Sequence, residues 1–271
     1  MERRRVILGV IVVIVLFAAA GVYNAACATE DRAVRVGGAE LAASQIQEWI
    51  LSLMATRPGV WAVVRPNSAG AGIRALLEGN ADIAVLTRPL TAEEGQQASA
   101  KGLKLAKKLV AYVPLLVVTN VRNPVKEVTL EQLRDIFVGK TTNWKELGGP
   151  DELIRCVTRR VPESGGTTFF QQLVLAKQQF GSATVMTDTW GSVVSECADE
   201  KKLAIGFSAA QHIRDPNVKV LSIKTDAKPQ TVRDETYPLI VPVYLCWDST
   251  TKDSRIPQIV DHCAMKGVGF K

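Results

Sequence analysis

The stretch NSAGAGIRALLEGNADIAVLT, residues 67–87, decides the fold class of this chain. It begins with a loop of small residues and continues into a short apolar helix over residues 73–79. It ends in ADIAVLT, residues 81–87, which has the pattern of a buried strand and stops at Arg88-Pro89. A loop, a helix and a buried strand in this order are typical of one unit of an α/β sheet.

The same alternation continues upstream of this stretch. AVRV, residues 33–36, predicts a strand, and apolar residues at helical spacing between Leu41 and Met54 predict a helix. VWAVV, residues 60–64, predicts the next strand. The order strand, helix, strand, helix, strand indicates an α/β protein with a parallel sheet, whose ligand sites lie beyond the carboxyl ends of the strands.

Two long apolar segments follow further along the chain. LVAYVPLLVVTN, residues 109–120, predicts one long strand. YPLIVPVYLCW, residues 237–247, contains two prolines and therefore predicts an edge strand or a crossover. Each of the two segments could carry the chain from one lobe to another.

The N-terminus has the pattern of an export signal. Three arginines in MERRR precede an uncharged apolar run from Val6 to Val22. This run is at the short end of the roughly 17–25 residues that span a bilayer. Residues 1–28 are therefore predicted to be a cleaved signal peptide, a lipidated leader or a retained membrane anchor. In each case the rest of the chain is expected to be periplasmic or otherwise extracytoplasmic, anchored or secreted.

Composition and charge narrow the class of protein. The chain of 271 residues is 47% hydrophobic and 22% charged, which is ordinary for a globular protein. Its net charge of +6 falls to +4 without residues 1–28, which is mildly basic and gives no argument for nucleic acid. Four of the five cysteines lie outside the leader, an even number that is consistent with disulfides in an oxidising compartment. No spacing indicates a metal site or a cofactor.

The turn Ser164-Gly165-Gly166-Thr167 runs directly into an apolar-periodic helix, and Arg160 lies four residues before it. Glycine turns at helix N-termini supply N–H donors and a favourable potential for an anion, and arginine pairs bidentately with oxyanions. The motif therefore predicts an anion cradle. The alternative is that Ser164 and Thr167 only cap a helix.

Five segments in this order resemble the periplasmic phosphate-binding proteins that feed ABC transporters, within the type II periplasmic-binding-protein superfamily. They are GAGIRALLEGNADIAVLTRPLT (70–91), NPVKEVTLEQLRDIFVGKTTNWKELGGP (123–150), RVPESGGTTFF (160–170), LAIGFSA (203–209) and YPLIVPVYL (237–245). The resemblance implies a two-lobed α/β fold with a hinge and an interlobe cleft, behind an N-terminal hydrophobic helix. Lobe I would comprise residues 29–118 and 238–271, and lobe II residues 119–237. Two disulfides, each inside one lobe, would then join Cys156 to Cys197 and Cys246 to Cys263.

The resemblance also implies a set of ligand-binding positions. They are Ala39, Glu40, Ser68, Ala69, Gly70, Thr87, Arg160, Ser164, Gly165, Gly166 and Thr167. Glu40 departs from the family, which has a hydroxyl shortly after its first strand, and a carboxylate facing the cleft would repel phosphate. Gly166 keeps a backbone donor where the family has threonine.

The sequence therefore predicts an exported, membrane-tethered solute-binding protein that binds an oxyanion, most simply phosphate, for an ABC permease. The alternative is a domain of the same fold that binds no ligand and serves as an anchored accessory subunit of a membrane complex. An enzyme is not expected, because the chain has no nucleophile-elbow serine and no evident carboxylate pair.

Overall fold

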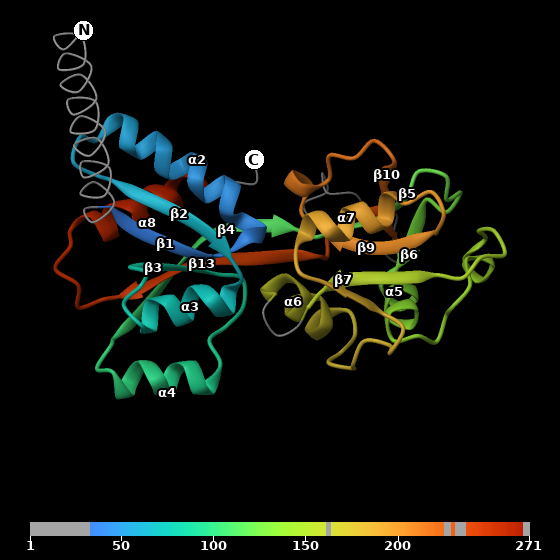
Figure 1. Ribbon diagram of the computed structural model, residues 1–271, viewed down its shortest axis with the longest axis horizontal. Coiled ribbons are helices and arrows are strands. Elements are labelled where there is room, and N and C mark those ends of the chain that lie inside the picture. The colour runs from blue at the N-terminus through green and yellow to red at the C-terminus, as the bar shows by residue number, and fades with distance from the viewer. Residues whose placement is uncertain (1–32, 161–163, 225–228, 231–236, 268–271) are drawn as a thin grey trace, which may run out of the picture.

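The computed structural model describes residues 33–160, 164–224, 229–230 and 237–267. The predicted leader, residues 1–28, lies outside this part of the chain. No helix within the described ranges is long and apolar enough to cross a membrane. The described residues form two five-stranded sheets with helices around each and one small three-stranded sheet (Figure 1).

The first sheet has the strand order β2-β1-β3-β13-β4. Strand β1 pairs in parallel with β2 and β3, and β13 pairs antiparallel with β3 and β4. The strands are β1 (Val34–Ala39), β2 (Ala62–Asn67), β3 (Ile83–Leu86), β4 (Leu105–Pro114) and β13 (Ile240–Asp248), and the helices are α2 (Glu40–Thr56), α3 (Ala69–Leu77), α4 (Ala92–Ala100) and α8 (Arg255–Gly267). We call this sheet and its helices unit I.

The second sheet has the strand order β10-β5-β9-β7-β8. Its strands are β5 (Leu116–Asn120), β7 (Arg155–Arg159), β8 (Val185–Thr187), β9 (Ala204–Ser208) and β10 (Val218–Val220). Its helices are α5 (Leu130–Phe137), α6 (Gly165–Leu173) and α7 (Trp190–Ala198), with the short 3-10 helices η1 (Trp144–Leu147) and η2 (Ala210–His212). We call this sheet and its helices unit II. The small sheet, β12 (Pro229–Gln230), β11 (Ser222–Lys224) and β6 (Glu127–Thr129), adjoins unit II along the chain.

The predicted α/β alternation is confirmed for the first part of the chain. The apolar stripe of α2 buries Leu41, Ile46, Ile50 and Leu53, as its spacing indicates. Strand β3 is buried along its whole length, as expected for a parallel strand covered on both faces.

The predicted strand over residues 109–120 is wrong in one respect. The segment contains two strands, β4 and β5, which separate after Pro114 and belong to different sheets. The chain therefore passes from unit I to unit II at this proline. Its apolar residues stay buried on both sides of the break, so hydropathy alone gives no sign of it.

The two prolines in residues 237–247 do not make β13 an edge strand, because β13 lies between β3 and β4. Residues Tyr244–Cys246 pair with β3, whereas Pro242 precedes them in the chain, where only β4 pairs with β13. Pro242 therefore needs no hydrogen-bond partner on its other side. The prediction of a crossover is correct, since the chain returns to unit I here.

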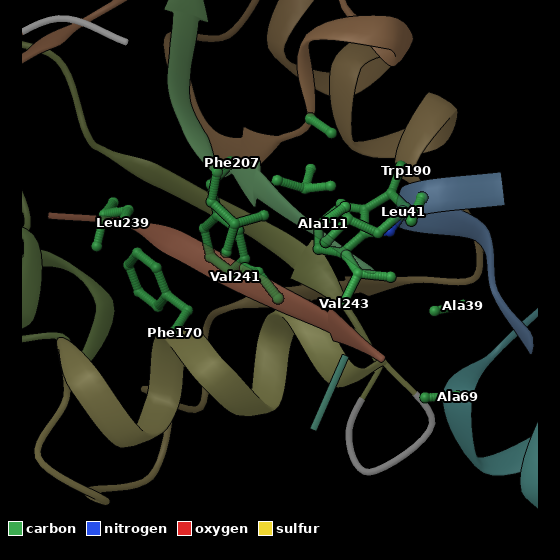
Figure 2. Close-up of a cluster of buried hydrophobic side chains, with 14 of the residues drawn as sticks. Ala39, Leu41, Ala69, Ala111, Phe170, Trp190, Phe207, Leu239, Val241 and Val243 are labelled. Carbon is green, nitrogen blue, oxygen red and sulfur yellow. The ribbon is translucent and has the colours of Figure 1, made fainter. Parts of the chain in front are cut away.

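The chain passes between the two units in two segments, one around Leu115 and one around Leu239, and these segments lie side by side. The Leu115 N–H donates to the Leu239 carbonyl at 2.8 Å, and the hydroxyl of buried Tyr237 donates to the Leu115 carbonyl at 2.8 Å. Apolar side chains from both units meet around this point: Leu41 of α2 lies beside Trp190 of α7, with Val241 and Phe207 nearby (Figure 2).

Two glycines let α3 pack directly against β1. A Cβ atom on Gly72 would lie 2.5 Å from the Cα atom of Gly38, and Gly38 itself has φ +137°. A side chain at either position would push the helix away from the strand. This contact fixes the N-terminus of α3 close to the end of β1, where α2 begins.

The predicted disulfides are absent. Cys156, Cys197, Cys246 and Cys263 are all buried free thiols. Burial raises the pKa of Cys156, Cys197 and Cys263 to about 12 and that of Cys246 to about 11. The even cysteine count reflects four small core residues, a common use of cysteine.

Candidate functional site

The predicted cradle forms the N-terminal turn of α6. Ser164 is the N-cap, and its hydroxyl accepts a hydrogen bond from the Thr167 N–H at 3.3 Å. Ser164 is 2% exposed, and Gly165, Gly166 and Thr167 are buried. The first-turn N–H groups of a helix have no partners within the helix, and its dipole makes this end attractive to anions. Ser164 does cap the helix, and this does not prevent the turn from holding an anion.

Thr87 faces this turn from unit I. It follows β3, is 1% exposed, and its hydroxyl has no hydrogen-bond partner among the described residues. A Cβ atom on Gly165 would overlap the Thr87 hydroxyl and lie 3.1 Å from the Thr87 Cβ. An unpaired buried hydroxyl costs free energy. Its position therefore suits a ligand that supplies the missing hydrogen bond.

The N-terminus of α3 forms another part of the same boundary. Ser68 is the N-cap and accepts a hydrogen bond from the Ala71 N–H at 3.0 Å, while Ala69 and Gly70 begin the helix. A Cβ atom on Gly70 would lie 3.5 Å from a guanidinium nitrogen of Arg74 and 3.5 Å from one of Arg88. Gly70 therefore lies in positive surroundings, although Glu94 holds Arg88 through a bidentate pair at 2.7 and 2.9 Å.

Glu40 is the first residue of α2 and follows the buried Ala39, which occupies the N-cap position without a side-chain bond. The Glu40 Oε2 atom lies 3.1 Å from the Arg159 Nη1 atom, which belongs to the end of β7 in unit II. The side chain of Glu40 is 26% exposed and that of Arg159 is 10% exposed. Burial raises the pKa of Glu40, and the positive charge of Arg159 opposes this only in part.

The two neighbouring arginines have different surroundings. The Arg159 guanidinium lies 5.6 Å from the centre of the Trp190 ring, and its Nε–H donates to the Asp188 carbonyl at 3.1 Å. Arg160 is 58% exposed, and its Nε atom lies 3.4 Å from the Asp188 carboxylate. Arg159 is thus a buried cation at the site that the resemblance did not indicate. The sequence feature that could have indicated Arg159 is its position at the end of a predicted strand, where ligand sites of α/β sheets lie.

A pocket of about 480 Å³ opens between the two units beside these residues. Unit I contributes Glu40, Pro66, Asn67, Ser68 and Ala71, and unit II contributes Arg159, Arg160, Thr187, Asp188 and Thr189. The structure therefore brings Glu40, Ser68 and Arg160 together in one pocket. The roles predicted for these residues and for the α6 turn stay predictions.

Helix η2 of unit II lies against the start of α2. The Gln211 side-chain amide donates to the Leu41 carbonyl. The pKa of His212 is lowered by burial and by the positive charges of Arg159 and Arg214. Together with the contact between Thr87 and Gly165, these interactions show that the two units are closed against each other.

Residues 24–260 match the family described as PBP superfamily domain. The chain belongs to this family. Its resemblance to phosphate-binding proteins of the type II superfamily is thereby confirmed, because several relatives carry that name.

Curated relatives of this PBP-superfamily chain include proteins named phosphate-binding protein PstS from three organisms. The one from Borreliella burgdorferi is 24% identical over 262 residues, covering 93% of this chain and 91% of the relative. The one from Bacillus subtilis is 32% identical over 181 residues, covering 65% of this chain and 57% of the relative. The match to PstS of Staphylococcus epidermidis spans 60% of that relative's length.

Solved structures show the same likeness. A protein from Clostridium perfringens, described as a phosphate ABC transporter substrate-binding protein with bound phosphate, is 26% identical with a TM-score of 0.73. The match covers 85% of this chain and 92% of that protein. An ABC-type phosphate transport receptor from Vibrio cholerae is also 26% identical, with a TM-score of 0.65 and coverage of 85% and 93%.

Proposed function

We propose that the chain is an extracytoplasmic solute-binding protein that holds an oxyanion between its two units and delivers it to an ABC permease. In this proposal the two units act as the two lobes expected from the sequence, and the chain passes between them near Pro114 and again near Leu239. The observation that carries the proposal is the buried hydroxyl of Thr87, which has no hydrogen-bond partner in the described part of the chain and faces the N-terminal turn of α6 across the boundary.

Phosphate is the ligand that we favour. A tetrahedral oxyanion removed from water needs many donors and a fixed cation. The α6 turn, the Thr87 and Ser68 hydroxyls, Arg160 and Arg159 can supply them. Relatives and solved structures whose names include phosphate binding support this choice.

The N-terminal segment, residues 1–28, would place the protein on the outer side of a membrane, either tethered or released. In the tethered form the binding units would stay close to a membrane partner. The permease assignment rests on the names of the relatives. The protein acts by binding in this proposal and has no catalytic role.

A second function has an observation of its own. Glu40 already supplies a carboxylate to Arg159, so a guanidinium near the cradle has a negative partner without any ligand. A domain that had given up its ligand could keep its closed form through such a pair. It would then be an anchored accessory subunit of a membrane complex.

Calorimetry on the full chain, in detergent if the leader is retained, distinguishes the two functions. Phosphate, sulfate and arsenate are each titrated at neutral pH. Saturable binding of phosphate at micromolar or lower concentration is expected for the transport function. No heat from any of the three anions would favour the accessory subunit.

A further inference from the structure

The edge of unit I that faces away from unit II is formed by loops at the starts of its strands. Strands β1, β2, β3 and β4 run in the same direction and begin at this edge, and their other ends lie toward unit II (Figure 1). The loops comprise residues 57–61, 78–82, 101–104 and 249–254. A Cβ atom on Gly59, Gly79 or Gly102 would have nothing within 4 Å. No described segment therefore packs over these three turns. We call this surface the distal edge.

An exposed tryptophan lies where the chain enters unit I. Trp61 is 54% exposed, and its backbone carbonyl accepts a hydrogen bond from the Val34 N–H at 2.7 Å, at the start of β1. The other four tryptophans are buried or half-buried. Tryptophan is enriched at the surfaces of bilayers, where its amphipathic ring lies among the lipid headgroups. Trp61 therefore suits contact with a membrane surface.

The length of the preceding segment brings the distal edge close to a membrane. The uncharged apolar run ends at Val22, and the first described residue is Ala33. Ten residues lie between them, and at about 3.3–3.6 Å per residue they reach at most about 36 Å. Unit II begins about 30 Å further away, which is the length of the nine-residue strand β13. With the run held in a bilayer, the distal edge is therefore the part of the described chain closest to the lipid.

The charge of the distal edge favours the same contact. Four exposed cations there have no carboxylate partner among the described residues. They are Arg57, Lys101, Lys104 and Lys252. Asp82 and Asp253 are held by arginines, at 2.8 and 2.6 Å, which leaves Glu78 and Asp248 as the carboxylates of these loops without an ion pair. Positive charge therefore prevails, and anionic headgroups attract lysine and arginine side chains near the membrane surface.

We propose that the distal edge docks on the surface of a bilayer that contains anionic lipids. Trp61 lies in the headgroup region, and the four cations lie over anionic headgroups. This inference rests on the tethered form of the proposed function. The pocket between the units lies at the other ends of β1 and β2, where Glu40 and Asn67 line it. Docking therefore leaves the pocket facing away from the membrane.

Quenching of tryptophan fluorescence by brominated lipids tests the inference on the full chain. The chain is reconstituted into vesicles of phosphatidylcholine and phosphatidylglycerol, with or without bromine on the acyl chains near the headgroup. The contribution of Trp61 is the difference between the wild type and Trp61→Phe, and residues 1–32 contain no tryptophan. Brominated lipids are expected to lower this contribution by at least about half, because the ring lies at the lipid surface. The emission of Trp61→Phe should change little.

A charge reversal tests the role of the cations. The double variant Lys104→Glu/Lys252→Glu is expected to weaken the quenching of Trp61 at least about twofold, because the new carboxylates repel anionic headgroups. Neutral vesicles of phosphatidylcholine alone should weaken it in the same way. The matched control is Lys126→Glu/Lys201→Glu, which reverses two exposed lysines outside the distal edge and should leave the quenching unchanged.

Two results would overturn the inference. Unchanged Trp61 emission in brominated vesicles that carry the chain would exclude docking and would leave the distal edge to a protein partner. Equal quenching in the wild type and in Lys104→Glu/Lys252→Glu would overturn the assignment to an anionic surface. Phosphate titration of the same vesicles separates this inference from the proposed function. A chain that docks and binds no phosphate would contradict the proposed function alone.

Discussion

The Glu40 carboxylate and the Arg159 guanidinium lie 3.1 Å apart and join the start of α2 in unit I to the end of β7 in unit II. Both side chains are mostly removed from solvent. The pair therefore links the two units directly and brings both signs of charge to the pocket between them.

Substitutions can distinguish the contributions of Arg159 and Arg160 to phosphate binding. Arg159→Ala is expected to weaken phosphate binding by about 30-fold or more, because truncating one partner of a buried charge pair costs about 2–5 kcal/mol. Arg160→Ala is expected to weaken it by less than about tenfold, because this side chain is 58% exposed. Calorimetric titration with phosphate measures both.

A larger loss of phosphate affinity in Arg160→Ala than in Arg159→Ala would identify Arg160 as the arginine that binds the ligand, as the family resemblance implies. Thermal unfolding of both variants without ligand provides the control. Arg159→Ala should lower the melting temperature more than Arg160→Ala, because it leaves Glu40 without its ion-pair partner.

The contact between Thr87 and Gly165 predicts a substitution that blocks closure. Gly165→Ala would place a methyl group where the Thr87 hydroxyl lies, so the two units could not approach as closely. Phosphate affinity is expected to fall more than about tenfold, and small-angle scattering should show a larger radius of gyration. Each unit should remain folded, since the clash is between them.

Gly95→Ala is the matched control for this substitution. Gly95 lies within α4, and nothing is within 4 Å of a Cβ atom there. Alanine in a helix is favoured over glycine by about 0.5–1 kcal/mol, so this variant should gain stability and bind normally. Normal phosphate affinity in Gly165→Ala would show that closure does not require the contact with Thr87.

Glu40 should make stability depend on pH. Its pKa in the folded protein is raised above 4.5, chiefly by burial, so folding favours the protonated carboxyl group. This contribution is fully present below pH 4.5 and is lost as pH rises through the raised pKa. The free energy of unfolding of Glu40→Gln, relative to the wild type, should therefore increase as pH rises above 4.5. Urea unfolding at a series of pH values measures it.

Phosphate binding to the wild type should weaken over the same range, because ionised Glu40 holds Arg159 and repels the anion. A constant difference in unfolding free energy between wild type and Glu40→Gln at all pH values would show that the carboxyl group faces solvent in solution.

The free thiols predict how the protein responds to reductant. Dithiothreitol should leave the melting temperature unchanged, since the four described cysteines form no disulfide. A thiol reagent at pH 8 should react slowly with these cysteines in the native protein, because each is buried and its pKa is raised to about 11 or 12. It should react quickly after unfolding. A drop of several degrees with reductant would indicate a disulfide in solution.

Local patterns in the sequence predict much of unit I. The spacing of Leu41, Ile46 and Ile50 determines which face of α2 is buried, and small residues before Ile73 mark the start of α3. The Ser164 turn begins α6 as expected, because a cap depends on residues only a few positions apart.

Contacts between distant parts of the chain were not predicted. Adjacent arginines at the end of a strand give no indication of which one Glu40 will face, since the partner is more than a hundred residues away. The break at Pro114 and the interior place of β13 likewise depend on which strands pair across the two sheets. The even number of cysteines outside the leader could not distinguish disulfide bridges from free thiols in the core.

The interior place of β13 has a consequence for the order in which the protein can fold during its synthesis. The five strands of the second sheet all lie between Leu116 and Val220, whereas the first sheet needs β13, which ends at Asp248, between β3 and β4. Unit II can therefore complete its sheet before the ribosome has made the last strand of unit I. Strands β1 to β4 lack β13 until the chain is almost finished, so the unpaired edges of β3 and β4 are exposed to aggregation for longest.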